Sequence, residues 1–229
     1  MIRGTVYTVI SLLFLLFSSC DENNYCVDGK IAGSVLDGDT LYLKRYSDNT
    51  FSEVGYTVVR NGRFEFEGLV SEPFVAGIFI GELLVMPLVV ESGDILAEIS
   101  DSQAVASGTM LNEALSTYIT KFIQYGEDMD NALKSEARLL MEGKSESYAR
   151  DFMERETAEC HAKMESFVEK FITDHYEDIL GPLVFRQWFG LMSYPMSNGL
   201  FKKVIDEAPE SFKEDMEIKG MIEYMCLER

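Results

Sequence analysis

The spacing of apolar residues changes near the middle of the chain, and this change restricts the possible folds more than any other feature. Between residues 25 and 100, short apolar runs alternate with turn residues at spacings of eight to twelve, which is typical of an antiparallel sandwich or barrel. From residue 109 onward the apolar residues recur with a helical period. The sequence therefore predicts an α+β protein: an antiparallel β-sandwich or barrel at 25–100, a connector at 101–109 and an α-helical bundle at 110–229.

The clearest β element is a predicted hairpin at residues 55–68, with the sequence GYTVVRNGRFEFEG. Asn61 and Gly62 suit a type I′ turn, because both positions of that turn need a positive φ. Phe64 and Phe66 alternate with charged residues, so one face of the hairpin is expected to be buried. Further apolar runs bring the expected total to about seven strands: 40–46, 74–80, 83–90 and 94–100. Pro87 predicts that its strand lies at a sheet edge or is bulged.

Two helical patterns dominate the first part of the second half. The first begins at Thr109 and is expected to end at Gly126, because glycine commonly follows the last residue of a helix. The second covers residues 145–176 and places one apolar stripe among many charged residues. Its length is typical of a helix in a bundle.

The last part of the chain contains two more predicted helices. Residues 178–194 are more apolar than the others and predict the inner helix, with Pro182 in its first turn, where a missing N–H group does no harm. Ser211 and Glu214 have the spacing of a capping box, which predicts the start of a last helix at that point. The residues of that helix expected to face inward are Met216, Ile222 and Met225.

The N-terminus predicts a secretory signal at residues 1–19. Arg3 supplies a positive charge, and Val6–Phe17 form a mostly apolar run of twelve residues, which is shorter than the roughly 20 residues of a membrane-spanning helix. The residues FSSC at 17–20 resemble a bacterial lipobox. Cys20 is therefore the expected lipidation site, and residues 20–24 are the expected lipid anchor and tether to the membrane.

This N-terminus also predicts where the protein resides. A lipid-anchored chain of this kind is expected in the outer membrane, facing the periplasm or the cell surface. Asp21 and Glu22, directly after the cysteine, resemble a short form of the acidic export signal of surface lipoproteins in the Bacteroidetes phylum.

The charge of the chain excludes one class of partner. The full sequence has 20 basic and 39 acidic residues, for a net charge of −19. Without Arg3 the mature chain would have 19 basic and 39 acidic residues, for a net charge of −20. Nucleic acid is not an expected partner, because its binding depends on clustered Lys and Arg, and the sequence has no basic run.

After lipidation of Cys20, three cysteines would remain: Cys26, Cys160 and Cys226. One disulfide is possible, with any of three pairings, and the odd number argues against a disulfide scaffold. The sequence has no C-x-x-C pair, which is the usual redox motif of exported thiol enzymes.

No catalytic residue, metal site or cofactor is predicted. The two histidines, His161 and His175, occur in no recognised metal-binding spacing. The acidic segments 37–40 and 126–131 lack the ligand order of a calcium loop. Residues 142–147, EGKSES, end like a phosphate-binding loop but have Arg138 where the first glycine belongs.

One concentration of aromatic residues allows two interpretations. Trp188 lies close in sequence to Phe185, Phe189 and Tyr194. These side chains would line a carbohydrate or peptide cleft, or they would pack in the core of an apolar helix, which is the simpler explanation.

The order of these features resembles a known family. Three motifs carry the resemblance: N-G-R-F-x-F-x-G at 61–68, L-x-x-E-x-G-x-I at 88–95 and G-T-x-L-N at 108–112. The chain resembles lipoproteins that carry the domain of unknown function 4369 followed by a helical spacer. In the long members of this group a thioredoxin-like domain of the thiol:disulfide interchange type comes next. This sequence has no Trp-Cys-x-x-Cys motif, so the resemblance does not imply oxidoreductase activity.

The leading functional hypothesis is a non-catalytic binding or accessory module of the cell envelope. A protein partner would engage an open strand edge, such as the one near Pro87. Two alternatives remain open: a thiol-redox accessory protein that works with a separate thioredoxin-fold partner, and a glycan-binding protein that uses the region of Trp188.

Overall fold

The structure is a computed structural model that describes residues 23–32, 36–47, 50–101, 103–191 and 198–227. The predicted signal at 1–19, the lipidation site Cys20 and the aromatic Tyr194 lie outside the described residues. The chain divides into two compact units between Thr109 and Met110. Each unit is described by itself.

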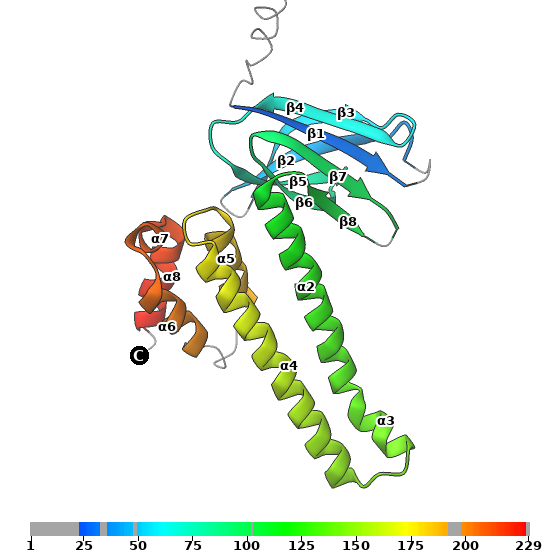
Figure 1. Ribbon diagram of the computed structural model, residues 1–229, viewed down its shortest axis with the longest axis vertical. Helices are drawn as coiled ribbons and strands as arrows, with labels where there is room; N and C mark the ends of the chain where they lie inside the picture. The colour runs from blue at the N-terminus through cyan, green and yellow to red at the C-terminus, as the bar shows by residue number, and fades with distance from the viewer. Residues whose placement is uncertain (1–22, 33–35, 48–49, 102, 192–197, 228–229) are drawn as a thin grey trace, which may run out of the picture. The chain divides into compact units, whose positions relative to one another are not determined.

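The first unit is a β-sandwich of two four-stranded sheets (Figure 1). Sheet A has the order β4 (Arg63–Leu69), β1 (Asn24–Ile31), β7 (Gly93–Ile99), β8 (Ala104–Ser107). Sheet B has the order β3 (Thr50–Val58), β2 (Thr40–Ser47), β5 (Phe74–Ile80), β6 (Leu83–Val90). Neighbouring strands are antiparallel except β1 and β7, which are parallel. The predicted sandwich is confirmed, and the sheets do not close into a barrel.

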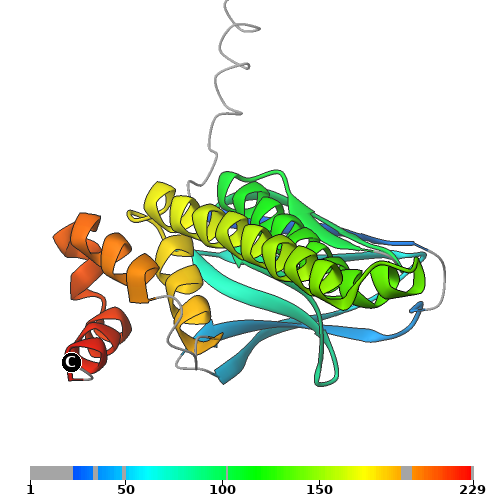
Figure 2. The ribbon, with the colours of Figure 1, turned by 90° about the horizontal axis from the view of Figure 1, so that it is seen from below.

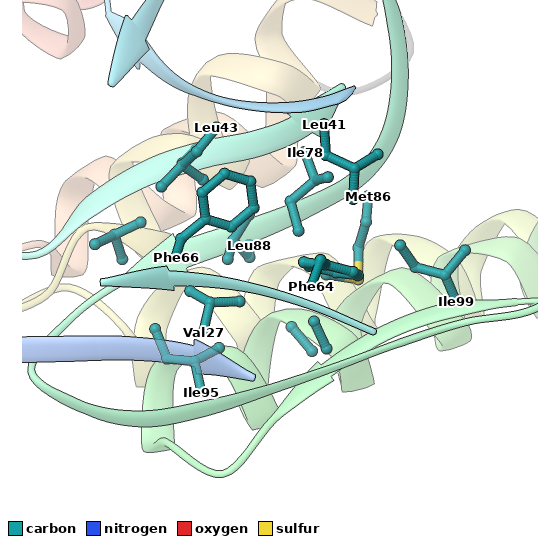
Figure 3. Packing of buried hydrophobic residues seen from close by; sticks show 14 of the residues in the cluster. Val27, Leu41, Leu43, Phe64, Phe66, Ile78, Met86, Leu88, Ile95 and Ile99 are labelled. Carbon is teal, nitrogen blue, oxygen red and sulfur yellow. The ribbon is translucent and has the colours of Figure 1, made fainter. Parts of the chain in front are cut away.

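The core of this unit lies between the two sheets (Figure 3). Val27 and Ile95 from sheet A meet Leu41 and Ile78 from sheet B, and all four side chains are fully buried. The predicted inward residues Phe64 and Phe66 are also buried. Strands β1, β4 and β7 therefore alternate between core and solvent as the period-2 pattern predicted, whereas β5 and β6 contain runs of consecutive buried residues.

The Asn-Gly turn forms as predicted, but the hairpin around it does not. Asn61 has φ 52° and Gly62 has φ 67°, as a type I′ turn requires. The strands that leave this turn enter different sheets, and only Arg60 and Arg63 pair directly beside it. The prediction of a hairpin was wrong because each strand finds a longer ladder elsewhere: β4 with β1, and β3 with β2.

Two predictions concern strands at the sheet edges, and one of them is confirmed while the other is wrong. Pro87 lies in β6, the last strand of sheet B, so the predicted edge position is confirmed. The segment predicted as a connector, 101–109, contains β8, which pairs antiparallel with β7. The sequence of β8, AVAS, is too short and too small in side-chain volume to give a recognisable alternation.

The second unit is helical. Its elements are α2 (Met110–Leu133), α3 (Ser135–Met141), α4 (Glu146–Asp174), α5 (Leu180–Leu191), α6 (Asn198–Glu207), α7 (Glu210–Glu214) and α8 (Met216–Leu227). Helices α2 and α4 run side by side in opposite directions and are joined through α3 (Figures 1 and 2). Ser145 caps α4 by accepting a hydrogen bond from the backbone N–H of Tyr148. The predicted inner helix corresponds to α5, where Val184 and Phe185 are fully buried.

Two predicted helix boundaries were wrong. Helix α2 continues through Gly126 to Leu133, because this glycine has an ordinary helical φ and open space beside it. Ser211 lies inside the short helix α7 and opens no capping box. The last helix begins instead after Asp215, whose carboxylate accepts hydrogen bonds from the N–H groups of Glu217 and Ile218.

The inward face of the last helix agrees only in part with the prediction. Met216, predicted to face inward, is 87% exposed, whereas Ile222 and Met225 are half-buried and Ile218 is fully buried. Among the described residues, no helix has the length and apolar character needed to cross a membrane.

Candidate functional site

The outer surface of sheet B carries aromatic side chains where a sandwich usually carries polar ones. The strand register places Tyr56 of β3 opposite Tyr42 of β2, and Tyr42 opposite Phe79 of β5. Phe79 in turn lies opposite Leu84 of β6, so this row crosses all four strands of the sheet. We use the name "aromatic face" for six residues of this surface: Tyr42, Tyr46, Phe51, Tyr56, Phe79 and Leu84.

The rings of the aromatic face contact one another. The ring centroids of Tyr42 and Tyr56 are 6.5 Å apart, those of Tyr46 and Phe51 are 5.1 Å apart, and those of Phe51 and Phe79 are 4.8 Å apart. Tilted and edge-to-face pairs at such distances are favourable and hold the rings in place. The surface is therefore an ordered layer of rings.

Exposure differs within the aromatic face. The exposed fraction is 69% for Tyr56, 44% for Phe51 and 43% for Leu84. Phe79 is buried beneath its neighbours. Leu84 and Phe79 occupy the space above Gly77, where an added Cβ would come within 2.4 Å of Leu84 Cδ1. The missing side chain at Gly77 therefore lets these two side chains lie flat on the sheet.

One charged pair borders the aromatic face. Lys44 Nζ lies 4.7 Å above the centroid of the Phe79 ring, a cation–π distance. The same ammonium group donates to Gly81 O at 3.2 Å and lies 3.3 Å from Glu82 Oε2. The positive charge held against the rings is thus already neutralised by Glu82.

The two edges of sheet B differ in accessibility. Residues 50–54 of β3 are exposed at every position, so both of its faces are open at this end. In β6, by contrast, Met86 and residues 88–90 are fully buried, and the exposed apolar part is limited to Leu83 and Leu84. The edge near Pro87 is therefore less accessible than the edge at β3.

Sheet A carries a different group on its outer surface. Cys26 lies opposite Glu67 on one side and Asp94 on the other, and its thiol donates to Glu65 Oε1 at 3.7 Å. The Sγ atom of Cys26 and one carboxylate oxygen each from Glu65 and Glu67 all lie within 4.8 Å of one another. A divalent metal ion of intermediate softness binds both sulfur and carboxylate oxygen as ligands. The sequence did not indicate this group, because only the β1–β4 register brings residue 26 beside residue 67.

The electrostatics of this group favour the protonated form of the Cys26 thiol. Burial raises the pKa of the Cys26 thiol, and the charges of Glu65, Glu67 and Asp94 raise it further. The hydrogen bond between Glu67 and Glu65, together with the negative charge of Glu65, raises the pKa of Glu67. Since the thiolate is the reactive form of cysteine, Cys26 is a poor nucleophile at neutral pH. A hollow of about 530 Å³, lined in part by Arg60 and Arg63, adjoins this thiol.

The predicted aromatic site in α5 is part of the helical core. Trp188 is 3% exposed and Phe185 is fully buried. Phe189 is half-buried and packs against Phe201, with ring centroids 5.4 Å apart. Tyr194 lies outside the described residues. Phe185 and Phe189 stack on each other, with ring centroids 6.5 Å apart, whereas Trp188 packs against Phe122 of α2, with ring centroids 6.2 Å apart. Trp188 lines neither the 530 Å³ hollow nor the hollow beside His175.

His175 lies at the C-terminal end of α4, and His161 lies within α4. His175 Nδ1 lies 2.7 Å from Asp178 Oδ2, while Asp178 Oδ1 accepts a hydrogen bond from the N–H of Leu180 at the start of α5. His161 lies one helical turn from Glu165, and its Nδ1 atom is 3.6 Å from Glu165 Oε2. A hollow of about 440 Å³ beside His175 is lined largely by Phe167, Phe171 and residues of α2.

Two of the remaining cysteines have described side chains. Cys26 and Cys160 are both half-buried free thiols. The side chain of Cys226 lies outside the described residues.

Eight strands in two sheets, followed by a helical unit, define a two-part α+β protein with an aromatic surface on its sandwich. The family model described as Domain of unknown function (DUF4369) matches residues 25–115. This match confirms the DUF4369 part of the resemblance seen in the sequence; it includes the sandwich except Asn24, and the start of α2. No curated protein matches the chain.

Proposed function

We propose that this protein is a non-catalytic lipoprotein of the cell envelope that acts as a binding or accessory module, and that the aromatic face of sheet B is its binding surface. The observation that carries the proposal is the exposure of Tyr56, Phe51 and Leu84 on one face of a sheet. Apolar and aromatic side chains that gather on a surface favour recognition, because burying them against a ligand releases water from a large area.

The rigidity of the aromatic face supports this role. Its six residues come from all four strands of sheet B, and their spacing is fixed by backbone ladders. Contacts between the rings further restrict their rotation. A surface that is ordered before binding loses little conformational entropy on binding, which favours affinity.

The predicted anchor gives the module its place in the envelope. Lipidation of Cys20 would tether the sandwich through residues 20–24, because the first described strand begins at Asn24. In metabolic labelling with an alkyne fatty acid, we expect the wild type to be labelled and to fractionate with the outer membrane. The Cys20→Ser variant should carry no label, and labelling of that variant would contradict the anchor.

The thiol-redox alternative gains no support from the described cysteines. Cys26 is surrounded by groups that raise the pKa of its thiol, whereas redox-active thiols have a lowered pKa. Cys160 belongs to the other structural unit and is also a free thiol.

Hydroxyl-radical footprinting tests the binding surface. The mature protein would be labelled alone and with a solubilised fraction of the cell envelope, and the labelling rate of each aromatic residue would be measured by mass spectrometry. We expect the envelope fraction to protect Phe51 and Tyr56. Tyr148 on α4 is 51% exposed and belongs to the helical unit, so it is the internal control and should not be protected. Equal labelling of Tyr56 with and without the envelope fraction would contradict the proposal.

A further inference from the structure

We infer that the ligand of the aromatic face is an uncharged glycan chain that lies across the strands of sheet B. This inference rests on the proposed function, because it names the class of ligand for the same surface. Three observations carry it: the direction of the aromatic row, the chemistry of the side chains, and the balance of charge.

The row of aromatic residues runs across the strands. From Tyr56 through Tyr42 and Phe79 to Leu84, the register joins one residue from each strand. Four strands at the usual separation span about 14 Å. A peptide that extends a sheet would instead run along an edge strand and bond to its free backbone groups. Strands β2 and β5 are paired on both sides, so a ligand above them meets side chains and no free backbone ladder.

The side chains suit sugar rings. A hexopyranose has one or two flat faces of C–H groups and a rim of hydroxyl groups. The C–H groups carry small positive charges, which the negative π-face of Tyr or Phe attracts. The phenol groups of Tyr42 and Tyr56 offer a donor and an acceptor each to the hydroxyl rim. The carboxylate of Glu82, which is 96% exposed, offers an acceptor beside the rings.

The charge balance favours a ligand without charge. Lys44, the cation held against the rings, is already bonded to Gly81 O and paired with Glu82. Glu53, opposite Lys44 in the register, adds a negative charge on β3. The whole chain has a net charge of −19, so a polyanionic glycan would be repelled. The aromatic face therefore fits a neutral chain of hexoses or pentoses better than an acidic one.

Isothermal titration with a panel of oligosaccharides tests the inference. The probes are neutral hexasaccharides of glucose, mannose and xylose in their common linkages, with an oligogalacturonate as the anionic probe. The protein is the full mature chain. We expect at least one neutral hexasaccharide to bind and the anionic probe not to bind. The variant Tyr56→Ser should weaken that binding about tenfold, as loss of an aromatic anchor does.

A matched control variant separates the surface from general effects. Tyr148→Ser removes an exposed tyrosine from α4, and it should bind the neutral glycan as the wild type does. Circular dichroism and urea unfolding confirm that both variants are folded. A second substitution, Phe51→Ser, keeps the test decisive if Tyr56→Ser is unstable.

Each outcome is decisive. Binding of a neutral glycan that Tyr56→Ser weakens and Tyr148→Ser leaves unchanged supports the inference. Binding of the anionic probe in preference to every neutral one overturns it, as does the absence of binding to the whole neutral panel. If no oligosaccharide of the panel binds but envelope components still protect Tyr56 in footprinting, the glycan inference is wrong and the proposed binding surface is still supported. If both fail, the proposed function fails as well.

Discussion

At the scale of single residues, glycines decide how the aromatic side chains of the sandwich pack. Gly29 and Phe64 are direct partners across β1 and β4, and so are Gly68 and Tyr25. In each pair the ring lies over the glycine, where a Cβ would come within 2.1 Å of Phe64 or 2.8 Å of Tyr25. An aromatic ring that covers a cross-strand glycine shields the backbone at that glycine and helps to fix the register of the two strands.

The first prediction concerns Gly29. The substitution Gly29→Ala forces the Phe64 ring out of its place, so we expect a loss of about 1–3 kcal/mol in the free energy of unfolding, measured by urea denaturation. Gly55→Ala is the matched control, because Gly55 has no positive φ and has open space beside it. A loss at Gly29 no greater than at Gly55 would contradict this packing.

The second prediction concerns a buried hydroxyl group. Tyr118 is 3% exposed, and its Oη has no hydrogen-bond partner among the described residues. Tyr118→Phe is therefore expected to leave the free energy of unfolding at pH 7 unchanged or raise it by about 1 kcal/mol. The control Tyr176→Phe should lower it by about 1 kcal/mol, because Tyr176 Oη donates to Val204 O at 2.6 Å.

The same variants predict a pH dependence. Burial raises the pKa of Tyr118 to about 12, above its ordinary value of about 10. Ionisation of this group therefore does not affect the free energy of unfolding below about pH 10, and it lowers that free energy as the pH rises from 10 towards 12. Tyr118→Phe should make this decline shallower. Identical alkaline profiles for the wild type and the variant would show that folding does not raise the pKa of Tyr118.

The third prediction concerns the reactivity of Cys26. Burial and the neighbouring carboxylates raise the pKa of its thiol, so alkylation by iodoacetamide at pH 8 should be slower than for a free cysteine. Glu65→Gln removes one of these charges while it keeps an oxygen that can accept from the thiol, and it should speed the alkylation. Glu98→Gln is the control, because Glu98 lies on the same strand as Asp94 but four residues further along, opposite Lys30. A rate unchanged by Glu65→Gln would contradict the assigned environment.

At the scale of elements, the sequence predicts those structures that depend on neighbours in the chain. Three predicted features follow from local pattern: the type I′ turn at Asn61 and Gly62, the burial of alternate residues in β4, and the helix α4. The failures depend on partners distant in sequence. The strands around the turn separate into two sheets, and β8 exists because β7 offers it a ladder.

The fourth prediction concerns Gly126, where the helix continues past a local helix-stop signal. Because α2 continues through this position with open space beside it, Gly126→Ala should raise the free energy of unfolding by about 1 kcal/mol. Gly108→Ala is a control with the opposite expectation, since Gly108 has φ 89° and its Cβ would come within 2.5 Å of Asp94 O. A destabilising effect at Gly126 would indicate that the helix ends there.

At the scale of the whole molecule, the candidate site was not visible in the sequence for a physical reason. Tyr42, Tyr56 and Phe79 stand far apart in the chain and become neighbours only through the register of three strands. The sequence drew attention instead to Trp188, whose aromatic neighbours are local, and the structure places that residue in the core of the helical unit. A local concentration of aromatic residues indicated packing, whereas the dispersed residues formed the surface.

The central claim is that the aromatic face of sheet B is a binding surface, and site-specific photo-crosslinking in living cells tests it most directly. The photoreactive residue p-benzoylphenylalanine, placed at position 56 or at the control position 148, inserts into C–H bonds of proteins and glycans alike. We predict adducts from position 56 that depend on light and are lost in a Phe51→Ser background, with none from position 148. The absence of adducts at position 56, or equal adducts at both positions, would contradict the claim.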